Sequence, residues 1–353
     1  MMKPVRVLII DDSATMRQLI RLRLRREAAI TVVGEAGNAD EARQALNRLA
    51  PDVLTLDVEM PGQSGLDFLR DLMRVRPMPV IMISSDTQRG SAAAIEALSI
   101  GAVDCIGKPR SADLNRAFDD LPALVLAAAS ANLNGRAGWA NAAPAALPVR
   151  AFHWNRRVVL IGASTGGVDA LERIISALPA DSPPVLIAQH MPAGFLASFA
   201  QRLNARCPPR VALACHEEPL RQGRVYLAPG GAHHLVLGPG LQPQCRLLAS
   251  EKVNGYRPSA DALFQSALPM AERVMAIVLT GMGHDGAQGL LALRRAGGLC
   301  LAQDEASSVV WGMPRLAWER GGASRLVPLD RIAGEILSNT SGRLRERRCE
   351  DGS

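Results

Sequence analysis

The chain has 353 residues, of which 48% are hydrophobic and 21% are charged, and its formal net charge is +6. This length predicts about two domains, and this composition is ordinary for globular protein. Part of the positive charge lies in residues 17–26 and 343–348, but aromatic residues make up only 3% of the chain. Without an aromatic platform or a recognition motif, we interpret these segments as a solvated helix face and a basic tail, and we expect no nucleic-acid partner.

No two of the six cysteines have the C-x-x-C spacing, so zinc and redox motifs have no support and a reducing cytoplasm fits better than a disulfide scaffold. The first six residues lead straight into a strand, without the apolar region of a signal peptide. The longest apolar stretch, 121–131, is too short to cross a bilayer. We therefore expect a cytoplasmic protein that does not insert into the membrane.

Residues 5–110 alternate short apolar runs with helical patterns. The runs at 5–10, 53–56 and 80–83 are predicted strands, and a helical stretch follows each of them. Alternation of this kind predicts a parallel sheet covered by helices on both faces. We assign residues 1–120 to this first α/β domain.

The alternating pattern stops after residue 120. Residues 121–155 are rich in Ala with Asn, Gly and Pro, so the first part can extend a helix and the remainder is predicted to be a linker. Strand and helix signals resume at Val158, which predicts a second, doubly wound α/β domain over residues 156–340. The last residues, 341–353, form a basic tail that we expect to be disordered.

Acidic residues follow two predicted strands of the first domain. Asp11 and Asp12 come after the first strand and Asp57 after a later one. Since the carboxyl ends of parallel strands meet at one edge, the carboxylates should cluster and need a cation, for which Mg²⁺ is well suited. Lys108 could add a fixed positive charge and Ser84 a hydroxyl. Helix capping alone would explain single residues such as Asp12, but not this ordered set.

The set resembles the receiver domain of two-component response regulators over residues 4–120. The matching residues are Asp11-Asp12-Ser13, 57–61, Gly65, Ser84-Ser85 and Lys108-Pro109. The resemblance implies a flavodoxin-like fold with a parallel sheet and assigns Asp57 as the phosphoryl acceptor. It also implies a Mg²⁺ ion held by Asp11, Asp12, Asp57 and the backbone carbonyl of Glu59.

The same resemblance implies how phosphorylation is sensed. Lys108 would pair with the acyl phosphate and Ser84 would bond a phosphate oxygen, with a histidine kinase as phosphodonor. Mg²⁺ and Lys108 would offset the charge on the transferred phosphoryl group. Cys105 stands where the family usually has an aromatic switch residue, so the usual aromatic readout of phosphorylation is in doubt.

Three apolar runs of the second half each end close to a polar residue. Residues 158–161 precede the glycine-flanked turn that contains Ser164, residues 185–189 precede His190, and residues 276–280 precede the loop that contains Asp285. The carboxyl ends of parallel strands share one rim, so these three side chains should meet there. A serine needs a base, and the base needs an orienting acid, so the three residues predict a catalytic triad.

Other interpretations of this turn and of the base are weaker. Residues 162–167 lack the spacing of a dinucleotide fingerprint, of a P-loop and of the G-x-S-x-G elbow. Among the histidines, His284 is the only serious rival to His190, because it adjoins Asp285 in the same glycine-rich loop.

Six motifs of this half resemble the catalytic domain of the chemotaxis protein-glutamate methylesterases: Gly162-Ala163-Ser164-Thr165-Gly166-Gly167, Gln189-His190-Met191-Pro192, Ala228-Pro229-Gly230, Pro258-Ser259-Ala260-Asp261, Gly281-Met282-Gly283-His284-Asp285-Gly286 and Ala302-Gln303-Asp304-Glu305-Ala306-Ser307. With the receiver in front, the resemblance covers residues 4–340. It implies hydrolysis of glutamyl methyl esters on methyl-accepting chemoreceptors, deamidation of receptor glutamines, and no cofactor for ester hydrolysis. It further implies an oxyanion hole made by the backbone amides of Thr165 and Met282, with His284 as a bystander.

Two other function classes fit the sequence less well. One is a phosphorylation-dependent binding module with a non-catalytic second domain, against which the intact Ser164, His190 and Asp285 set argues. The other is a DNA-binding response regulator, which lacks a segment of helix-turn-helix size after the linker.

Overall fold

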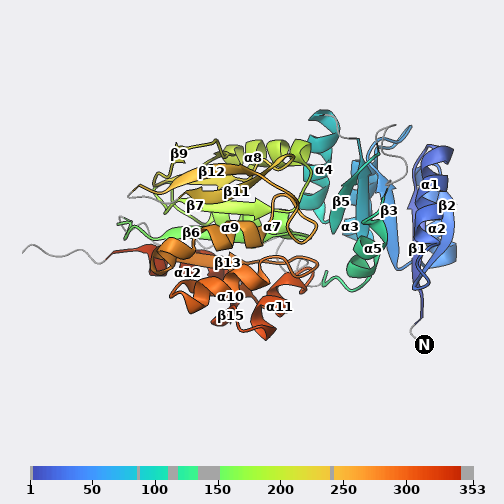
Figure 1. Ribbon diagram of the computed structural model, residues 1–353. Coiled ribbons are helices and arrows are strands. Elements are labelled where there is room, and N and C mark those ends of the chain that lie inside the picture. The colour runs from blue at the N-terminus through green and yellow to red at the C-terminus, as the bar shows by residue number, and fades with distance from the viewer. Residues whose placement is uncertain (1–2, 86–87, 110–117, 134–151, 239–241, 343–353) are drawn as a thin grey trace, which may run out of the picture.

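The computed structural model describes residues 3–85, 88–109, 118–133, 152–238 and 242–342 (Figure 1). Two α/β units lie side by side. The N-terminal unit is built on a five-stranded sheet, and the C-terminal unit on a seven-stranded sheet with a small three-stranded one beside it. The predicted two-domain α/β fold is therefore confirmed.

The N-terminal sheet is wholly parallel, with strand order β2-β1-β3-β4-β5. This is the flavodoxin-like order expected for a receiver. Its strands are β1 (Val5–Ile10), β2 (Ile30–Ala36), β3 (Val53–Asp57), β4 (Val80–Ser84) and β5 (Asp104–Gly107). Its helices are α1 (Ala14–Leu24), α2 (Ala39–Leu49), α3 (Gly65–Val75), α4 (Gln88–Ile100) and α5 (Leu121–Ala129).

Two local features fix the carboxyl edge of this sheet. Ser13 caps α1 by accepting a hydrogen bond from the amide of Met16, which starts the helix directly after the acidic pair that follows β1. At the start of α3, a Cβ on Gly65 would lie 1.8 Å from the carbonyl oxygen of Asp57. Only glycine therefore lets the backbone of α3 approach the end of β3 so closely.

The segment 121–155, expected to be a linker that could begin with a helix, starts with α5. Its residues Leu121, Val125 and Ala128 are buried with Val7 and Ile9 of β1, so this helix packs on the receiver sheet. Residues 134–151 of that segment and residues 343–353 of the expected basic tail lie outside the described residues. The domain limits drawn from the sequence stay predictions.

The C-terminal sheet is also parallel, with order β15-β14-β13-β6-β7-β10-β8. Alternate residues of β6 enter opposite apolar layers: Val159 and Ile161 pack with Leu171 of α7, whereas Leu160 packs with Leu263 of α9. Both faces of the sheet are thus covered by helices, as a doubly wound fold requires.

The elements of this unit begin with β6 (Val158–Ala163), α7 (Gly167–Ser176), β7 (Val185–Gln189), α8 (Ala193–Arg206), β8 (Arg210–Leu213), β9 (Glu218–Pro219), β10 (Arg224–Leu227), β11 (His233–Gly238) and β12 (Gln244–Ala249). They continue with α9 (Ala260–Ser266), η2 (Leu268–Arg273), β13 (Val274–Val278), α10 (Ala287–Arg295), β14 (Leu299–Gln303), α11 (Met313–Glu319), β15 (Arg325–Val327) and α12 (Leu329–Thr340). The antiparallel sheet β11-β12-β9 packs its first strand against α9.

The two units are in direct contact. Helix α4 of the N-terminal unit packs against α7 and α8 of the C-terminal unit, as Figure 1 shows. After α5, Asn132 donates its backbone amide to the carbonyl of Val309 at 3.0 Å and its side-chain amide to the carbonyl of Ala306 at 2.9 Å. Within the described ranges, no helix combines the length and apolarity needed for a bilayer crossing.

Candidate active site

Three neighbouring strands of the large sheet position the predicted triad. Strands β13, β6 and β7 are adjacent and parallel, so their carboxyl ends form one rim. Ser164 follows β6 directly, His190 follows β7 directly, and Asp285 lies in the loop between β13 and α10. The backbone amide of His190 donates to the carbonyl of Ala163 at 3.0 Å, which ties the first two strand ends together. The structure thus places all three residues on the shared rim.

His190 and Asp285 form a buried hydrogen-bonded pair. Nε2 of the imidazole lies 2.8 Å from Oδ2 of the carboxylate, and the two side chains are 3% and 0% exposed. An ionised carboxylate only accepts hydrogen bonds, so the neutral ring must carry its proton on Nε2. Nδ1 then bears the lone pair, and within the described residues this buried atom has no hydrogen-bond partner. The ring is therefore left with one nitrogen able to accept a proton.

Asp285 is held ionised by the groups around it. Besides His190, its carboxylate accepts hydrogen bonds from Asn254 Nδ2 at 2.9 Å, Ser259 Oγ at 2.7 Å and the Ala260 amide at 2.6 Å. Burial alone would raise the pKa of Asp285, but the hydrogen bonds from His190, Asn254 and Ser259 outweigh it and lower the pKa to about 2. A fixed negative charge therefore faces the imidazole throughout the physiological range.

Glycines shape the turn that presents Ser164. A Cβ on Gly281 would lie 2.7 Å from Cβ of Ser164, and one on Gly167 would lie 2.1 Å from Oε1 of Gln189. Gln189 in turn donates from Nε2 to the carbonyl of Ser164 at 3.0 Å. These close approaches explain why glycine is needed both after the nucleophile, at Gly167, and in the loop after β13 that packs on it, at Gly281.

Helix α7 begins at Gly167, so its amide dipoles point back toward this turn. Thr280 also braces the turn, because its hydroxyl donates to the carbonyl of Thr165 at 2.9 Å. Within the described part of the chain, the backbone amides of Thr165 and Met282 donate no hydrogen bond. Both are therefore available to a developing oxyanion.

Sequence reasoning missed two side chains that contact the triad. Asn254 bonds Asp285, and Tyr256 stacks on His190 with ring centroids 3.8 Å apart and planes inclined by 7°. Ser259 lies in a motif recognised for its resemblance but given no role. The dipeptide Asn254-Gly255 was a signal for a tight turn, although nothing in it pointed to the active site. His284, the rival base, makes no side-chain hydrogen bond within the described residues.

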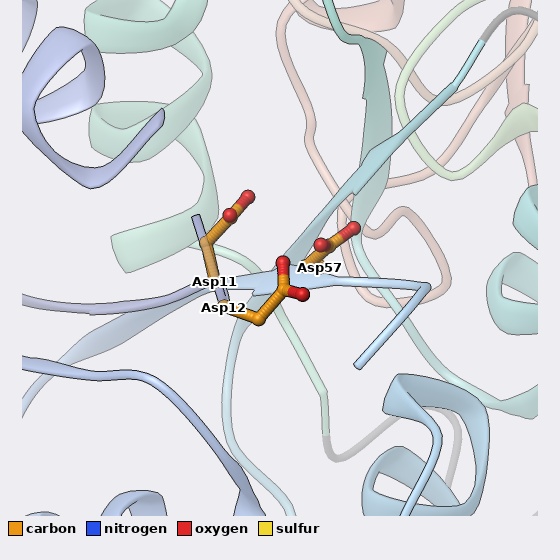
Figure 2. Close-up of side chains that lie close together, drawn as sticks. All are labelled: Asp11, Asp12 and Asp57. Carbon is orange, nitrogen blue, oxygen red and sulfur yellow. The ribbon is translucent and has the colours of Figure 1, made fainter. Parts of the chain in front are cut away.

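The second predicted site lies at the carboxyl edge of the receiver sheet. Oxygen atoms of Asp11, Asp12 and Asp57 lie within 4.8 Å of one another (Figure 2). Lys108 Nζ is 2.7 Å from Oδ2 of Asp57 and 3.4 Å from Oδ2 of Asp11. Burial, together with repulsion from Asp11, raises the pKa of Asp57 to about 6, although Lys108 works in the opposite direction.

These residues suit a hard divalent cation. The cluster offers only oxygen ligands, and among the described residues the buried Oδ2 of Asp11 has only the long 3.4 Å ion-pair contact with Lys108 and no hydrogen bond. The amide of Glu59 donates to Oδ1 of Asp57 at 3.2 Å, which holds the Glu59 backbone beside the acceptor.

The remaining predicted receiver residues lie beside this cluster. Ser84 is buried at the end of β4, and its carbonyl accepts the amide of Lys108 at 2.7 Å. Cys105 of β5 is buried, and burial raises the pKa of its thiol well above the usual range, so this residue is a small apolar group in place of an aromatic ring.

Comparison with known proteins identifies both domains. The family model described as CheB methylesterase matches residues 159–336, and that of the response regulator receiver domain matches residues 7–118. A protein-glutamate methylesterase/protein-glutamine glutaminase of Agrobacterium fabrum is 49% identical, over 96% of this chain and 97% of its own length. One from Caulobacter vibrioides is 48% identical, over 97% of this chain and 100% of its own.

Among solved structures, the CheB methylesterase catalytic domain of Thermotoga maritima is similar to the C-terminal unit. It is 36% identical, with a TM-score of 0.50, and the match covers 52% of this chain and 98% of that one. The identity extends over nearly the full length of the chain, and both domains match in the same order. The chain belongs to the CheB methylesterase family, whose members here join a receiver domain to a methylesterase catalytic domain.

Proposed function

We propose that this chain, a protein-glutamate methylesterase and protein-glutamine glutaminase, acts on methyl-accepting chemoreceptors through a triad of Ser164, His190 and Asp285. The observation that supports this best is the buried His190–Asp285 pair on the rim that also presents Ser164. The chain would work in the cytoplasm, where it meets the signalling segments of receptors, and ester hydrolysis would need no cofactor.

The proposed reaction begins with attack of Ser164 Oγ on the ester carbonyl carbon. The proton of Oγ passes to Nδ1 of His190, because Nε2 is already bonded to Asp285. Asp285 stabilises the imidazolium, and the amides of Thr165 and Met282 stabilise the oxyanion. Methanol leaves with the proton from Nδ1, and an acyl-serine remains.

Water then attacks the acyl-serine and gives its proton to the same nitrogen. The glutamate carboxyl group is released and Oγ of Ser164 recovers its proton. With a glutamine side chain the first leaving group is ammonia instead of methanol, and every other step is the same. This shared route accounts for both activities with one set of residues.

In the receiver we propose that Asp57 accepts a phosphoryl group from a histidine kinase. Asp11, Asp12, Asp57 and the backbone carbonyl of Glu59 would hold Mg²⁺, which neutralises charge on the phosphoryl group when bound. Lys108 would pair with the acyl phosphate, and Ser84 would bond one of its oxygens. The short contact between Lys108 Nζ and Asp57 supports the first of these assignments.

We propose that the unphosphorylated receiver restricts access to the triad. Three contacts support this: α4 packs on α7 and α8, Asn132 bonds the 306–309 loop, and Asp104 of β5 accepts a hydrogen bond from the hydroxyl of Thr165. Phosphorylation would rearrange Ser84 and the neighbouring surface and shift the population toward an undocked receiver. Cys105 must transmit this change without an aromatic ring.

The test is the rate of methanol release from methylated receptor by three samples: full-length chain alone, full-length chain with phosphodonor and Mg²⁺, and a chain that lacks residues 1–150. The last should be well folded, because the similar Thermotoga maritima domain was crystallised without a receiver. We expect the second and third samples to exceed the first. If all three rates agree, the receiver serves docking or localisation, and if none releases methanol, the alternative of a non-catalytic binding module gains support.

A further inference from the structure

One short segment delivers most of the contacts around the His190–Asp285 pair. Residues 254–261 supply Nδ2 of Asn254, the ring of Tyr256, Oγ of Ser259 and the amides of Ala260 and Asp261, all to the pair itself. The hydrogen bonds that this segment makes to the pair all go to Asp285. The only contact from this segment to the imidazole of His190 is the stacked ring of Tyr256. The proposed reaction gives that ring no role.

The backbone explains how Asn254 and Tyr256 reach opposite members of the pair. Asn254 and Gly255 have φ angles of 53° and 85°, and Val253 and Tyr256 exchange hydrogen bonds of 2.9 and 3.1 Å. Positive φ at both central residues of a two-residue hairpin defines a type I′ turn, for which Asn-Gly is strongly favoured. This turn geometry directs the Asn254 amide to Asp285 and the Tyr256 ring to His190.

Asn254 anchors the turn at two carboxylates. Its Nδ2 donates to Oδ1 of Asp285 at 2.9 Å and to Oδ2 of Asp261 at 2.7 Å. Asn254 itself is exposed, but both acids are almost fully buried, so the two carboxylates hold the turn from the interior side. The position of the Tyr256 ring over the imidazole is therefore determined by the same carboxylate that orients Nε2.

We infer that Tyr256 is a positioning residue for His190: its aromatic face fixes the plane of the imidazole so that Nδ1 meets Ser164, and stabilises the positive charge that the ring gains during the reaction. This inference rests on the proposed triad. A single hydrogen bond at Nε2 does not fix the plane of the imidazole, because the ring can still tilt about the line from its Cγ atom to Nε2. A parallel ring at 3.8 Å opposes that tilt. An aromatic face also attracts a cation, most strongly where water is excluded, and this imidazole is 3% exposed.

The phenol hydroxyl of Tyr256 has no role in positioning His190. Tyr256 makes no side-chain hydrogen bond through its hydroxyl within the described residues, and its neighbour across the site is Gly283, at which a Cβ would lie 3.7 Å from that oxygen. The contact with His190 is made by the ring alone. Phenylalanine should therefore replace tyrosine, whereas an aliphatic side chain of similar size should not.

The experiment compares Tyr256→Phe, Tyr256→Leu and Tyr256→Met in the full-length chain, with methylated receptor as substrate and with phosphodonor present. We expect kcat to fall roughly 10-fold for Leu and Met with KM unchanged, and Phe to recover most of the rate. Trp154→Leu is the matched control, because Trp154 is also a half-buried aromatic but precedes β6 at the opposite end of the strand. Its kcat should equal that of the unaltered chain.

A spectroscopic readout separates positioning from general damage. In protein with labelled histidine, the carbon-bound ring protons of His190 should be shifted upfield by the tyrosine or phenylalanine ring and should lose this shift in the Leu variant. The inference is overturned if kcat stays within twofold after the ring current is lost, if KM rises in place of a fall in kcat, or if Phe is as slow as Leu.

Two further comparisons keep the inference apart from the proposals on which it rests. Ser164→Ala in the same assay tests the triad itself: if it retains activity, the proposed function fails, whereas an inactive Ser164→Ala beside a fully active Tyr256→Leu overturns the role of Tyr256 alone. Tyr256 also lies within electrostatic range of Asp104 and Asp120 of the receiver. The fall in kcat must therefore be the same in the chain without residues 1–150, and an effect seen only with the receiver present would overturn the inference.

Discussion

The hydroxyl of Thr165 donates a hydrogen bond to Oδ2 of Asp104, and this bond joins the two domains at the active site. Thr165 directly follows Ser164, and Asp104 directly precedes Cys105, which stands where receivers usually have an aromatic switch residue. The other oxygen of Asp104 accepts the amide of Cys105 at 2.8 Å, so its carboxylate is held in place. The receiver thus contacts the nucleophile turn through a residue next to its own switch position.

Asp104→Ala should raise the rate of the unphosphorylated enzyme. A hydrogen bond to a charged group contributes about 1.5–3 kcal/mol, so its loss would shift the docking equilibrium roughly 10-fold or more toward the open form. The measurement is methanol release from methylated receptor without phosphodonor. Asp40→Ala is the control, because it removes an exposed receiver carboxylate on α2 that is bonded to Arg43 of the same helix. Equal basal rates for both variants would mean that the Thr165–Asp104 bond does not restrain the receiver.

Ser164→Ala should keep the fold and lose roughly 10³-fold or more in kcat, as expected when a triad nucleophile is removed. The fold should survive because Ser164 is held by backbone bonds that alanine retains, including its amide to the carbonyl of Thr280 at 3.1 Å. Steady-state rates on methylated receptor, together with a thermal unfolding midpoint, provide the check. Near-normal hydrolysis by this variant would remove Ser164 as the nucleophile.

The residues at the rim of the sheet could be predicted from the sequence because each is marked by the residues directly before it. Each of Ser164, His190 and Asp285 lies at or just past an apolar run, and parallel strands bring such ends together whatever their separation along the chain. The same logic found Asp11, Asp57 and Lys108 in the receiver. In both domains the sequence supplied the strand ends, and the topology placed them side by side as expected.

The contacts around the rim could not be found in this way. Asn254 and Tyr256 reach the site from a tight turn that follows β12 of the antiparallel sheet, and no periodic pattern links that turn to β7 or β13. Their positions depend on long-range packing, to which the local sequence contributes only an Asn-Gly turn signal. The Thr165–Asp104 bond is a property of how two domains dock, which the pattern of either domain alone does not specify.

His190→Gln should abolish turnover, whereas His284→Gln should leave most of it. The difference follows from geometry: His190 is bonded to Asp285 and has a free Nδ1, whereas the only hydrogen bond of His284 within the described residues is through its backbone carbonyl, to the amide of Ala287. Single-turnover assays on both variants at saturating receptor distinguish the two. The opposite pattern would show that His284, and not His190, is the base.

Asp285→Asn should lower kcat by roughly 10⁴-fold, by analogy with removal of the orienting carboxylate in other triads. An amide can donate to Nε2, which would move the imidazole proton to Nδ1 and leave no lone pair toward Ser164. Because the pKa of Asp285 is about 2, below its ordinary value of 3.8, the carboxylate of the unaltered chain is ionised throughout pH 6 to 9. The difference between this carboxylate and the amide of the variant is then the same at every pH in that range. The loss of rate should therefore persist between pH 6 and 9, and recovery at either end would argue against a tautomer effect.

The acidic cluster of the receiver should make its stability depend on both pH and Mg²⁺. The folded-state pKa of Asp57 is about 6, against an ordinary 3.8, so between these values the unfolded chain releases its proton first. The protonated carboxyl of Asp57 therefore contributes fully to the free energy of unfolding below pH 3.8, and this contribution is lost as pH rises to about 6. In a chelator, the thermal midpoint of the receiver should thus fall from pH 5 to pH 7.

Added Mg²⁺ should raise that midpoint at pH 7.5 and have much less effect at pH 5, because protons compete with the metal for the same carboxylate. Differential scanning calorimetry of the full-length chain measures both trends. Asp57→Asn supplies the control, since it removes the titrating group and one ligand but keeps the shape of the side chain. Its midpoint in chelator should be higher at pH 7.5, nearly constant between pH 5 and 7, and only weakly raised by Mg²⁺. If the variant and the unaltered chain respond identically to pH and Mg²⁺, then Asp57 neither titrates near pH 6 nor binds the metal.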